Sequence, residues 1–390
     1  GELTDFAAVG VKAVDAHTLE IRLAHPVPYF LSLLTYPCWR PLPIDVIEEH
    51  DGLRRPGSRW TRAGNLVSSG PFQLTRWEQN RVLVVERNPH YWDAETVGLN
   101  AIHFYTVESY DTEERMFRSG QLHITLNVPL TKRETYLAME HSPLRDDPLL
   151  GTYFFRFNTT REPFDDPRVR RALSLAIDRE AIVNKVTRGG QAPAGSFTPP
   201  SVGGFEPTQL VSFDPDEARR LLVEAGFPEG RGFPNSDLLY NTSESHRTIA
   251  EAIQQMWKVE LGIDISLYNQ EWKVYLDSLD SLDFDVTRSG WTAVYNDANQ
   301  FLEIFAPENP NNHTGWADLA YHDLLTASMR ESDPERRQET LQRLDAMLID
   351  QGVVAPIYHY TNSYLIDPRV KNWIPGPYDK RLYKYVRLEE

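Results

Sequence analysis

The sequence has a single cysteine, Cys38, among its 390 residues. One cysteine excludes an internal disulfide bond and any zinc site built on cysteines. Its neighbours, Pro37 and Trp39, favour an inert and partly buried sulfur over a reactive thiol. Long apolar runs are missing too. Nothing approaches the ~18 consecutive apolar residues of a membrane-spanning helix, and no basic amphipathic helix stands out.

The sequence has fewer basic than acidic residues. Lysine and arginine together number 40, against 56 aspartate and glutamate residues, which gives a formal net charge of −16. No block of like charges interrupts this pattern. Because such a surface repels a polyanion, we expect no nucleic-acid partner.

Motifs of catalysis and metal binding are also missing. The eleven histidines are scattered, without an H-E-x-x-H pattern or a His/Cys cluster at metal-ligand spacing. There is no phosphate-binding glycine loop, nucleophile elbow or dinucleotide fingerprint. The carboxylate pairs Glu113-Glu114 and Asp165-Asp166 stand at predicted helix starts, where capping explains them. We therefore predict no enzyme activity, no catalytic residue, no metal site and no cofactor.

What the chain does have is an alternation of strands and helices. Its length is too great for one simple core, so we expect two or more lobes. A strand at 236–241, a helix at 245–262 and a strand at 263–269 have the spacing of a βαβ unit, which predicts a parallel sheet. Further strands or strand pairs are predicted at 9–24, 67–93, 102–107, 122–129, 284–291 and 353–366. The fold class is therefore α/β.

Residues 155–185 are the most informative segment. A strand ends at an Asn-Thr-Thr turn, and two helices follow. Asp166 precedes Pro167, which places a capping carboxylate before a proline at the first helical position. Asp178 is positioned to cap the second helix, which Gly189-Gly190 end.

This segment closely resembles the signature of the family 5 extracellular solute-binding proteins, the peptide-capturing components of ABC importers. The resemblance extends over 67–93, 217–227, 238–265, 269–276 and 284–291, and several of these stretches are closer to the oligopeptide-binding branch. It implies a periplasmic-binding-protein-like type II fold. Such a fold has two α/β lobes joined by a hinge, which close on a ligand, and here part of a small accessory domain.

The resemblance also implies a domain division. Residues 1–46 are expected to be a remnant of the small accessory domain, 47–150 with 364–390 an incomplete lobe one, and 151–363 lobe two. Family members carry a substantial segment before the point where this sequence begins. We therefore expect an N-terminally truncated chain with a strand edge that is unpaired or covered by a neighbour.

The resemblance places three candidate ligand-binding residues on the strand at 284–291. Arg288 stands where peptide binders have an arginine for the carboxyl end of the ligand, a role that suits a guanidinium. Gly290 permits close approach of a ligand backbone. Trp291 offers a flat apolar wall with one donor. The alternatives are an ion pair of Arg288 with Asp283 or Asp285 and an ordinary core position for Trp291.

Three more candidates lie elsewhere in the chain. His246, at the start of the helix at 245–262, matches a position that meets the carboxylate of a longer peptide. Trp272 matches a residue of a side-chain pocket, and Arg156 adds a second basic group. The alternatives are a solvated helix start for His246 and a core position for Trp272.

One departure from the family pattern bears on the ligand. Peptide-binding relatives have W-x-x-D after this strand, and that aspartate holds the N-terminal ammonium of the peptide. Here the run is Trp291-Thr292-Ala293-Val294, and valine offers no charge. Asp297, three residues on, is a substitute only if the loop is reshaped. The balance therefore shifts towards an anionic or neutral ligand.

The leading hypothesis is a solute-binding protein that delivers oligopeptides or peptide-like ligands to the permease subunits of an ABC importer. It implies a periplasmic or extracellular location, a lipid anchor on the missing N-terminal part, and a monomer for the full-length protein. Two alternatives stay open: a binding protein for an oligosaccharide or other non-peptide solute, and a sensory or regulatory module with the same fold.

Overall fold

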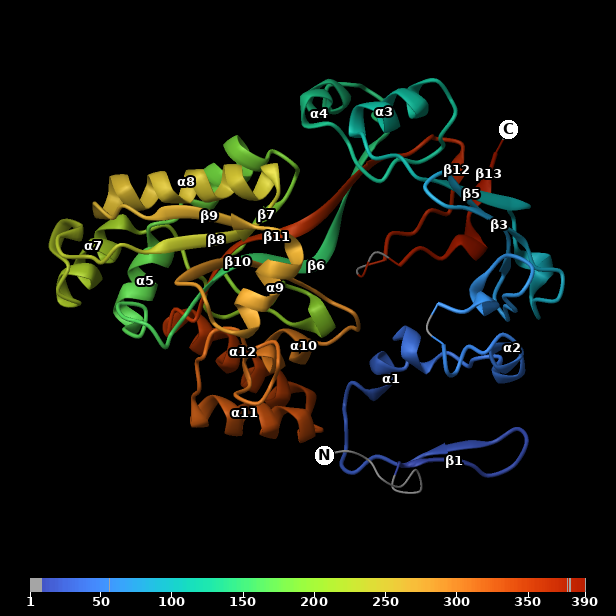
Figure 1. Cartoon of the computed structure of the whole chain (residues 1–390), viewed down its shortest axis with the longest axis horizontal. Coiled ribbons are helices and arrows are strands. Elements are labelled where there is room, and N and C mark those ends of the chain that lie inside the picture. Colours follow the sequence, from blue (N-terminus) through green and yellow to red (C-terminus); the bar gives the residue numbers. More distant parts are fainter. Residues whose placement is uncertain (1–8, 56, 377, 379, 390) are drawn as a thin grey trace. The chain divides into compact units, whose positions relative to one another are not determined.

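The computed structural model describes residues 9–55, 57–376, 378 and 380–389 (Figure 1). The chain folds into two compact units. Unit 1 comprises Gly1–Pro37, Leu150–Thr187 and Ala192–His359, and unit 2 comprises Cys38–Leu149, Arg188–Gln191 and Tyr360–Glu390.

The predicted division into an accessory segment and two lobes stays a prediction. The predicted boundaries at 150 and 363 lie near the points where the chain passes between the units, at Leu149–Leu150 and His359–Tyr360. The predicted accessory segment 1–46 is divided between both units, and its first eight residues lie outside the described part of the chain. Its assignment to a separate domain stays a prediction.

Unit 1 is built on a sheet with the strand order β7-β11-β6-β10-β8-β9. The strands are β6 (Leu144–Phe157), β7 (Ala192–Pro193), β8 (Asp237–Asn241), β9 (Ser266–Gln270), β10 (Val286–Thr292) and β11 (Val354–Leu365). Strands β8 and β9 pair in parallel and are joined by helix α8 (Glu244–Leu261), which confirms the predicted βαβ unit. Strand β10 pairs in parallel with β8 and antiparallel with β6.

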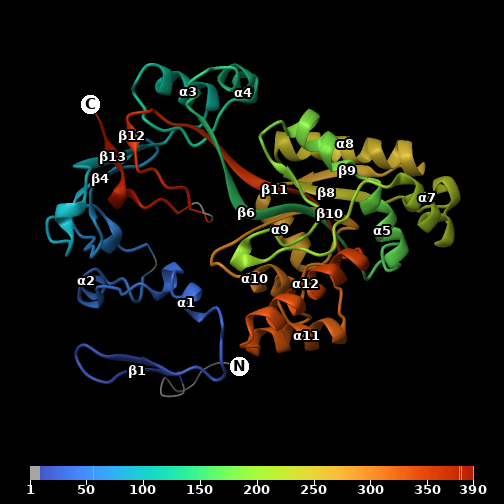
Figure 2. The same ribbon diagram turned by 180° about the vertical axis from the view of Figure 1, so that it is seen from behind.

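Helices cover both faces of this sheet. Helix α8 lies over one face and α9 (Trp272–Asp280) over the other (Figures 1 and 2). On the α8 side, fully buried Trp257 donates its indole N–H to the carbonyl of Leu173 at 2.8 Å. On the α9 side, Leu239, Tyr275, Leu279 and Phe284 form a buried cluster.

Unit 1 also contains elements outside this sheet. They are β1 (Val11–Ala13), β2 (Leu19–Ile21), α1 (Phe30–Leu33), α5 (Pro167–Leu175), α6 (Arg179–Ala181), the π-helical turn η5 (Ile182–Thr187), η6 (Val202–Gly204), α7 (Pro215–Glu224), η7 (Pro228–Gly230), α10 (Asn299–Leu302), η8 (Glu303–Phe305), α11 (Leu319–Arg330) and α12 (Pro334–Asp350).

The predicted helix starts are confirmed. The Asp166 carboxylate accepts from the backbone N–H of Arg168 at 2.8 Å, directly before Pro167. Asp178 accepts from the N–H of Ala181 at 2.9 Å. The second helix of this segment then continues as the π-helical turn η5 rather than as regular α-helix.

Unit 2 contains the antiparallel sheet β3-β4-β5. Its elements are η2 (Pro37–Trp39, at the boundary with unit 1), α2 (Ile44–Glu49), η3 (Arg59–Thr61), β3 (Phe72–Glu78), β4 (Val82–Arg87), η4 (Ala94–Thr96), β5 (Ala101–Tyr105), α3 (Tyr110–Arg118), α4 (Leu130–Leu137), β12 (Val370–Lys371), η9 (Tyr383–Tyr385) and β13 (Arg387–Leu388). In the described part of the chain, β5 is an edge strand. A cavity of about 460 Å³ lies beside it, lined also by residues 121–126 and 370–388.

The predicted strand at 122–129 is wrong. This segment has the alternating pattern of a strand, but its pairing is limited to an isolated bridge between Ile124 and Ile366. The cavity separates it from the edge of β5, so its apolar side chains line the cavity without a ladder partner.

Two smaller predictions are also wrong. Cys38 is exposed, because it lies in the short turn η2, where Trp39 is itself 42% exposed and provides no cover. Glu113 and Glu114 do not cap a helix, since Ser109 caps α3. Glu113 instead accepts from the N–H of Leu126 at 2.6 Å, and the neighbouring carboxylate from the phenol of Tyr136.

Two features are absent from the described residues. Within those residues, no helix combines the length and apolar character needed to cross a bilayer. The same residues contain no group of three or more His, Cys, Asp or Glu side chains placed to hold a metal ion.

The cap at Asp166 gives a stability test. Asp166→Ala removes an acceptor from the first turn of α5 and is expected to lower the free energy of unfolding of unit 1 by about 1 kcal/mol. The matched control is Asp165→Ala, which removes an exposed neighbouring carboxylate outside the cap. Urea unfolding followed by circular dichroism measures both. Equal losses in the two variants would contradict the capping role.

Candidate ligand-binding site

The register between β10 and β6 decides where the predicted site residues lie. Arg288 pairs with Phe155, Gly290 with Tyr153 and Trp291 with Thr152. Because successive side chains of a strand point to opposite faces, Arg288 and Gly290 lie on one face of the sheet and Trp291 on the other. The six candidates therefore divide into two groups.

Arg288 and His246 meet around Tyr153, on the face covered by α8. The guanidinium of Arg288 lies over the Tyr153 ring, 4.8 Å from its centre, and its Nη1 donates to Asn241 Oδ1 at 3.1 Å. His246, in the first turn of α8, has its Nδ1 3.3 Å from the phenol oxygen of Tyr153. Tyr153 stacks in turn on Tyr358 at 4.8 Å. These contacts fix the direction of the arginine.

The electrostatics of this group favour an anion. Burial, and after it the positive charge of Arg288, together lower the pKa of His246 to about 4. The imidazole is therefore neutral near pH 7, so the guanidinium is the charged member of the group. A carboxylate at this place meets a cation and the N-terminal turn of an 18-residue helix.

Trp272 and Trp291 lie on the α9 side. Trp272 begins α9, is 50% exposed, and stacks on Tyr275 with ring centres 5.6 Å apart. The phenol of Tyr275 donates to the carbonyl oxygen of Arg288, which ties α9 to β10. The indole nitrogen of Trp291 is buried and has no acceptor among the described residues. An exposed ring and an unused donor suit a ligand, whereas Tyr275 is core.

Arg156 lies on that second face, opposite Thr287, and is only 2% exposed. Its Nη1 donates to the carbonyl of Asn311 at 3.0 Å and lies 2.6 Å from Nδ1 of His313. Burial lowers its pKa to about 10, so the group is still charged at neutral pH. His313 connects it to Asp280, 3.1 Å from the other ring nitrogen. The structure thus places Arg156 apart from the Arg288 group.

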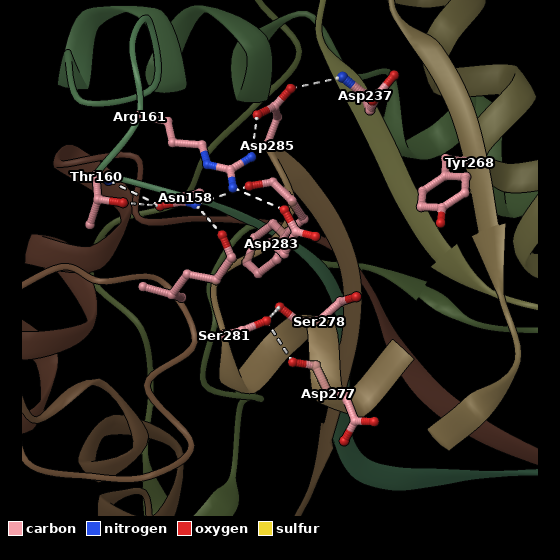
Figure 3. Close-up of polar contacts among 12 residues, drawn as sticks. Asn158, Thr160, Arg161, Asp237, Tyr268, Asp277, Ser278, Ser281, Asp283 and Asp285 are labelled. Atoms are coloured by element: carbon pink, nitrogen blue, oxygen red, sulfur yellow. Dashed lines mark hydrogen bonds and ion pairs between the residues drawn. The ribbon is translucent and has the colours of Figure 1, made fainter. Parts of the chain in front are cut away.

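Asp283 and Asp285, considered as alternative partners of Arg288, form their ion pairs with Arg161 instead. Arg161 holds both carboxylates, with Nη2 3.1 Å from Asp283 and Nη1 3.3 Å from Asp285 (Figure 3). Asp285 also accepts from the backbone N–H of Asp237 at 3.1 Å.

The loop after β10 contains Val294, which stands where peptide binders have an aspartate, and Asp297, the proposed substitute. Val294 is 41% exposed, and its N–H donates to Gln300 Oε1 at 2.7 Å. Asp297 is 5% exposed and forms two hydrogen bonds with Arg337, at 2.7 and 2.8 Å. A carboxylate neutralised in this way is not available to a ligand ammonium, so Asp297 does not replace the missing aspartate.

Sequence reasoning missed Tyr153 and Asn241, which orient Arg288. Both lie on strands next to β10 in the sheet, but their sequence distance from Arg288 hides the contact. The signal that could have found Tyr153 is the strand alternation of 150–157 once the pairing with β10 is known.

Comparison with known proteins defines the class. A family model described as "Bacterial extracellular solute-binding proteins, family 5 Middle" matches residues 2–313. The periplasmic oligopeptide-binding protein OppA of Salmonella typhimurium is 36% identical over 387 residues, which cover 96% of this chain and 70% of that protein. The probable deoxycholate-binding periplasmic protein YgiS of Escherichia coli is 32% identical, with coverage of 97% and 71%.

A solved structure agrees with the sequence comparison. The Escherichia coli murein tripeptide binding protein MppA superposes with a TM-score of 0.81 at 35% identity, covering 97% of this chain and 74% of that one. The predicted type II periplasmic-binding-protein fold is thereby confirmed. The chain belongs to the family 5 bacterial extracellular solute-binding proteins.

The contact of His246 with the Arg288 group gives a pH test. We expect the imidazole to titrate near pH 4, well below its ordinary 6.5, because burial and the guanidinium both disfavour its charged form. Arg288→Met removes one of these two causes and is expected to raise the midpoint. Proton NMR of the imidazole measures it. A midpoint that stays unchanged in the variant would contradict the proximity of the two groups.

Proposed function

We propose that this chain captures oligopeptides or peptide-like ligands for an ABC importer, with Arg288 as the anchor for the ligand's carboxylate. The observation that carries the proposal is the guanidinium held between Tyr153 and Asn241 beside a neutral histidine. A fixed, partly buried cation is what an unspecific peptide binder needs at the carboxyl end, which all peptides share. Relatives named for oligopeptide and murein peptide binding support the same ligand class.

The other candidate residues have different roles in the proposed ligand site. Gly290 and Trp291 border the ligand at the end of β10, and the exposed ring of Trp272 forms a wall of a side-chain pocket. His246 donates the N–H of its neutral imidazole to the carboxylate. Arg156 supplies positive potential rather than direct contact, because it is buried.

The biological setting follows from the family. Its members bind solutes and are not named as enzymes, and the relatives are periplasmic. We infer a periplasmic or extracellular location with a lipid anchor, monomeric action, and the permease subunits of an importer as partners. Units 1 and 2 correspond in this proposal to the two lobes.

A non-peptide solute is the second candidate. Val294 offers no charge where peptide binders have aspartate, and a relative at 32% identity is named as a probable deoxycholate-binding protein. A ligand with a carboxylate and no amine satisfies Arg288 and needs no acidic partner. Native mass spectrometry of the protein from its host separates the candidates by the mass of the bound ligand.

Arg288 is tested by truncation. Arg288→Ala is expected to weaken binding of trialanine by roughly 1.5–3 kcal/mol, the contribution of a hydrogen bond to a charged group. Arg247→Ala, at an exposed arginine of α8, is the control and should leave affinity unchanged. Calorimetry measures both. The anchor role is refuted by an Arg288→Ala variant that binds trialanine as the parent protein does.

Val294 is tested by restoring the acid. Val294→Asp is expected to raise the affinity for trialanine, because a carboxylate at this position pairs with the ligand ammonium. Val294→Asn has nearly the same size without the charge and should give little gain. Equal affinities of the two variants would show that the position does not face the ligand amine.

A further inference from the structure

A carboxylate without a cation lies just beyond β10. Glu303 begins η8 and is half-buried. Its Oε2 accepts from Asn299 Nδ2 at 2.9 Å and its Oε1 from the phenol of Tyr295 at 3.4 Å. Within the described ranges of the chain, no lysine, arginine or histidine forms an ion pair with it. Removing a carboxylate from water without a cation is costly, so a positively charged group bound next to Glu303 would be stabilising.

A second acceptor without a donor stands beside it. Asn299 is completely buried, and its Oδ1 has no hydrogen-bond partner in the described part of the structure. Its Nδ2 donates to Glu303, so exchanging the two ends of the amide would bring two acceptors together. The orientation of Asn299 is therefore fixed, and its carbonyl is left unsatisfied next to the carboxylate.

The charged groups nearby do not supply the cation that Glu303 lacks among the described residues. Asp297 and Arg337 neutralise each other through their two hydrogen bonds, and the guanidinium lies over the ring of Tyr29 at 5.1 Å. Tyr29 and Tyr295 stack with ring centres 5.8 Å apart. Burial raises the pKa of Tyr29 to about 12 and raises that of Tyr295 as well, so both phenols are neutral. When Glu303 is ionised, the group as a whole therefore carries one negative charge without a cation among the described residues.

We propose that Glu303, Asn299, Tyr29 and Tyr295 bind the ammonium group of the ligand. An ammonium has three donors, which match the carboxylate and the unsatisfied amide oxygen, and aromatic faces attract its charge. The site replaces the aspartate missing at Val294, whose N–H fastens this loop to Gln300 of α10. The inference rests on the proposed function and narrows its ligand class to solutes with a primary amine.

The same geometry predicts a pH dependence. Burial raises the pKa of Glu303, and the negative charge of Asp297 raises it further, against the hydrogen bonds from Tyr295 and Asn299. Above this raised pKa the carboxylate is charged and holds the ammonium. As the pH falls through it, the attraction is lost, whereas a ligand without an amine keeps its affinity.

The test compares trialanine with N-acetyltrialanine by calorimetry. The parent protein should prefer the free amine by at least tenfold, and Glu303→Gln should abolish this preference while leaving the acetylated peptide unaffected. Glu308→Gln is the matched control, since that exposed carboxylate pairs with His322 and lies outside the site. Equal affinity of the parent for both peptides, or an unchanged preference in Glu303→Gln, overturns the inference.

The experiment distinguishes a failure of the peptide-binding proposal from a failure of the ammonium site. If the parent protein binds neither peptide, the peptide proposal fails, and the site is then judged with propylammonium as the probe. Saturable NMR shifts at Tyr29 and Tyr295 in the parent, absent in Glu303→Gln, support the ammonium site. Shifts that are absent in the parent, or the same in both proteins, refute it.

Discussion

The pairing of β10 with β6 is the constraint on which the site depends. Its register runs without a break from Val286, opposite Phe157, to Thr292. A slip of one residue would carry Arg288 to the opposite face of the sheet, away from Tyr153 and His246. The side chain of Asn158 secures this register where β6 ends, since its amide donates to the carbonyls of Leu282 and Phe284 at 2.9 Å (Figure 3). Buried Asn158 thus helps to fix the face of the sheet on which Arg288 lies.

Several carboxylates around this sheet are paired with arginines inside unit 1. Arg161 forms ion pairs with two aspartates at one end of β10, and Arg337 neutralises Asp297 at the other. Because these carboxylates are occupied, they do not compete for Arg288. Glu303 has no such partner among the described residues, so in our proposal unit 1 offers the cation of Arg288 and the anion of Glu303 at different places. A zwitterionic ligand complements that distribution, whereas a simple anion complements only half of it.

The sequence predicts local structure better than it predicts contacts. Caps such as Asp166 are visible because donor and acceptor are two residues apart, and the βαβ unit because its periodicities are regular. The strand at 122–129 failed because pattern alone does not supply a pairing partner. For the site, the resemblance pointed to Arg288, but Tyr29 escaped notice because it meets Asn299 across 270 residues. Such a contact exists only once the chain has folded.

The passages of the chain between the units are fastened in unit 2 by one network. Arg133 donates to Asp146 of β6 at 2.8 Å. The hydroxyl oxygen of Ser363 in β11 lies 2.6 Å from that carboxylate and 2.8 Å from the carbonyl oxygen of Gly189, and its single proton is donated to one of these two acceptors. Burial alone would raise the pKa of Asp146, but the hydrogen bonds from Arg133 and Ser363 outweigh it and lower the pKa, so the network stays charged at neutral pH. The three crossing segments, at Asp146, Gly189 and Ser363, are thereby held together at one point within unit 2.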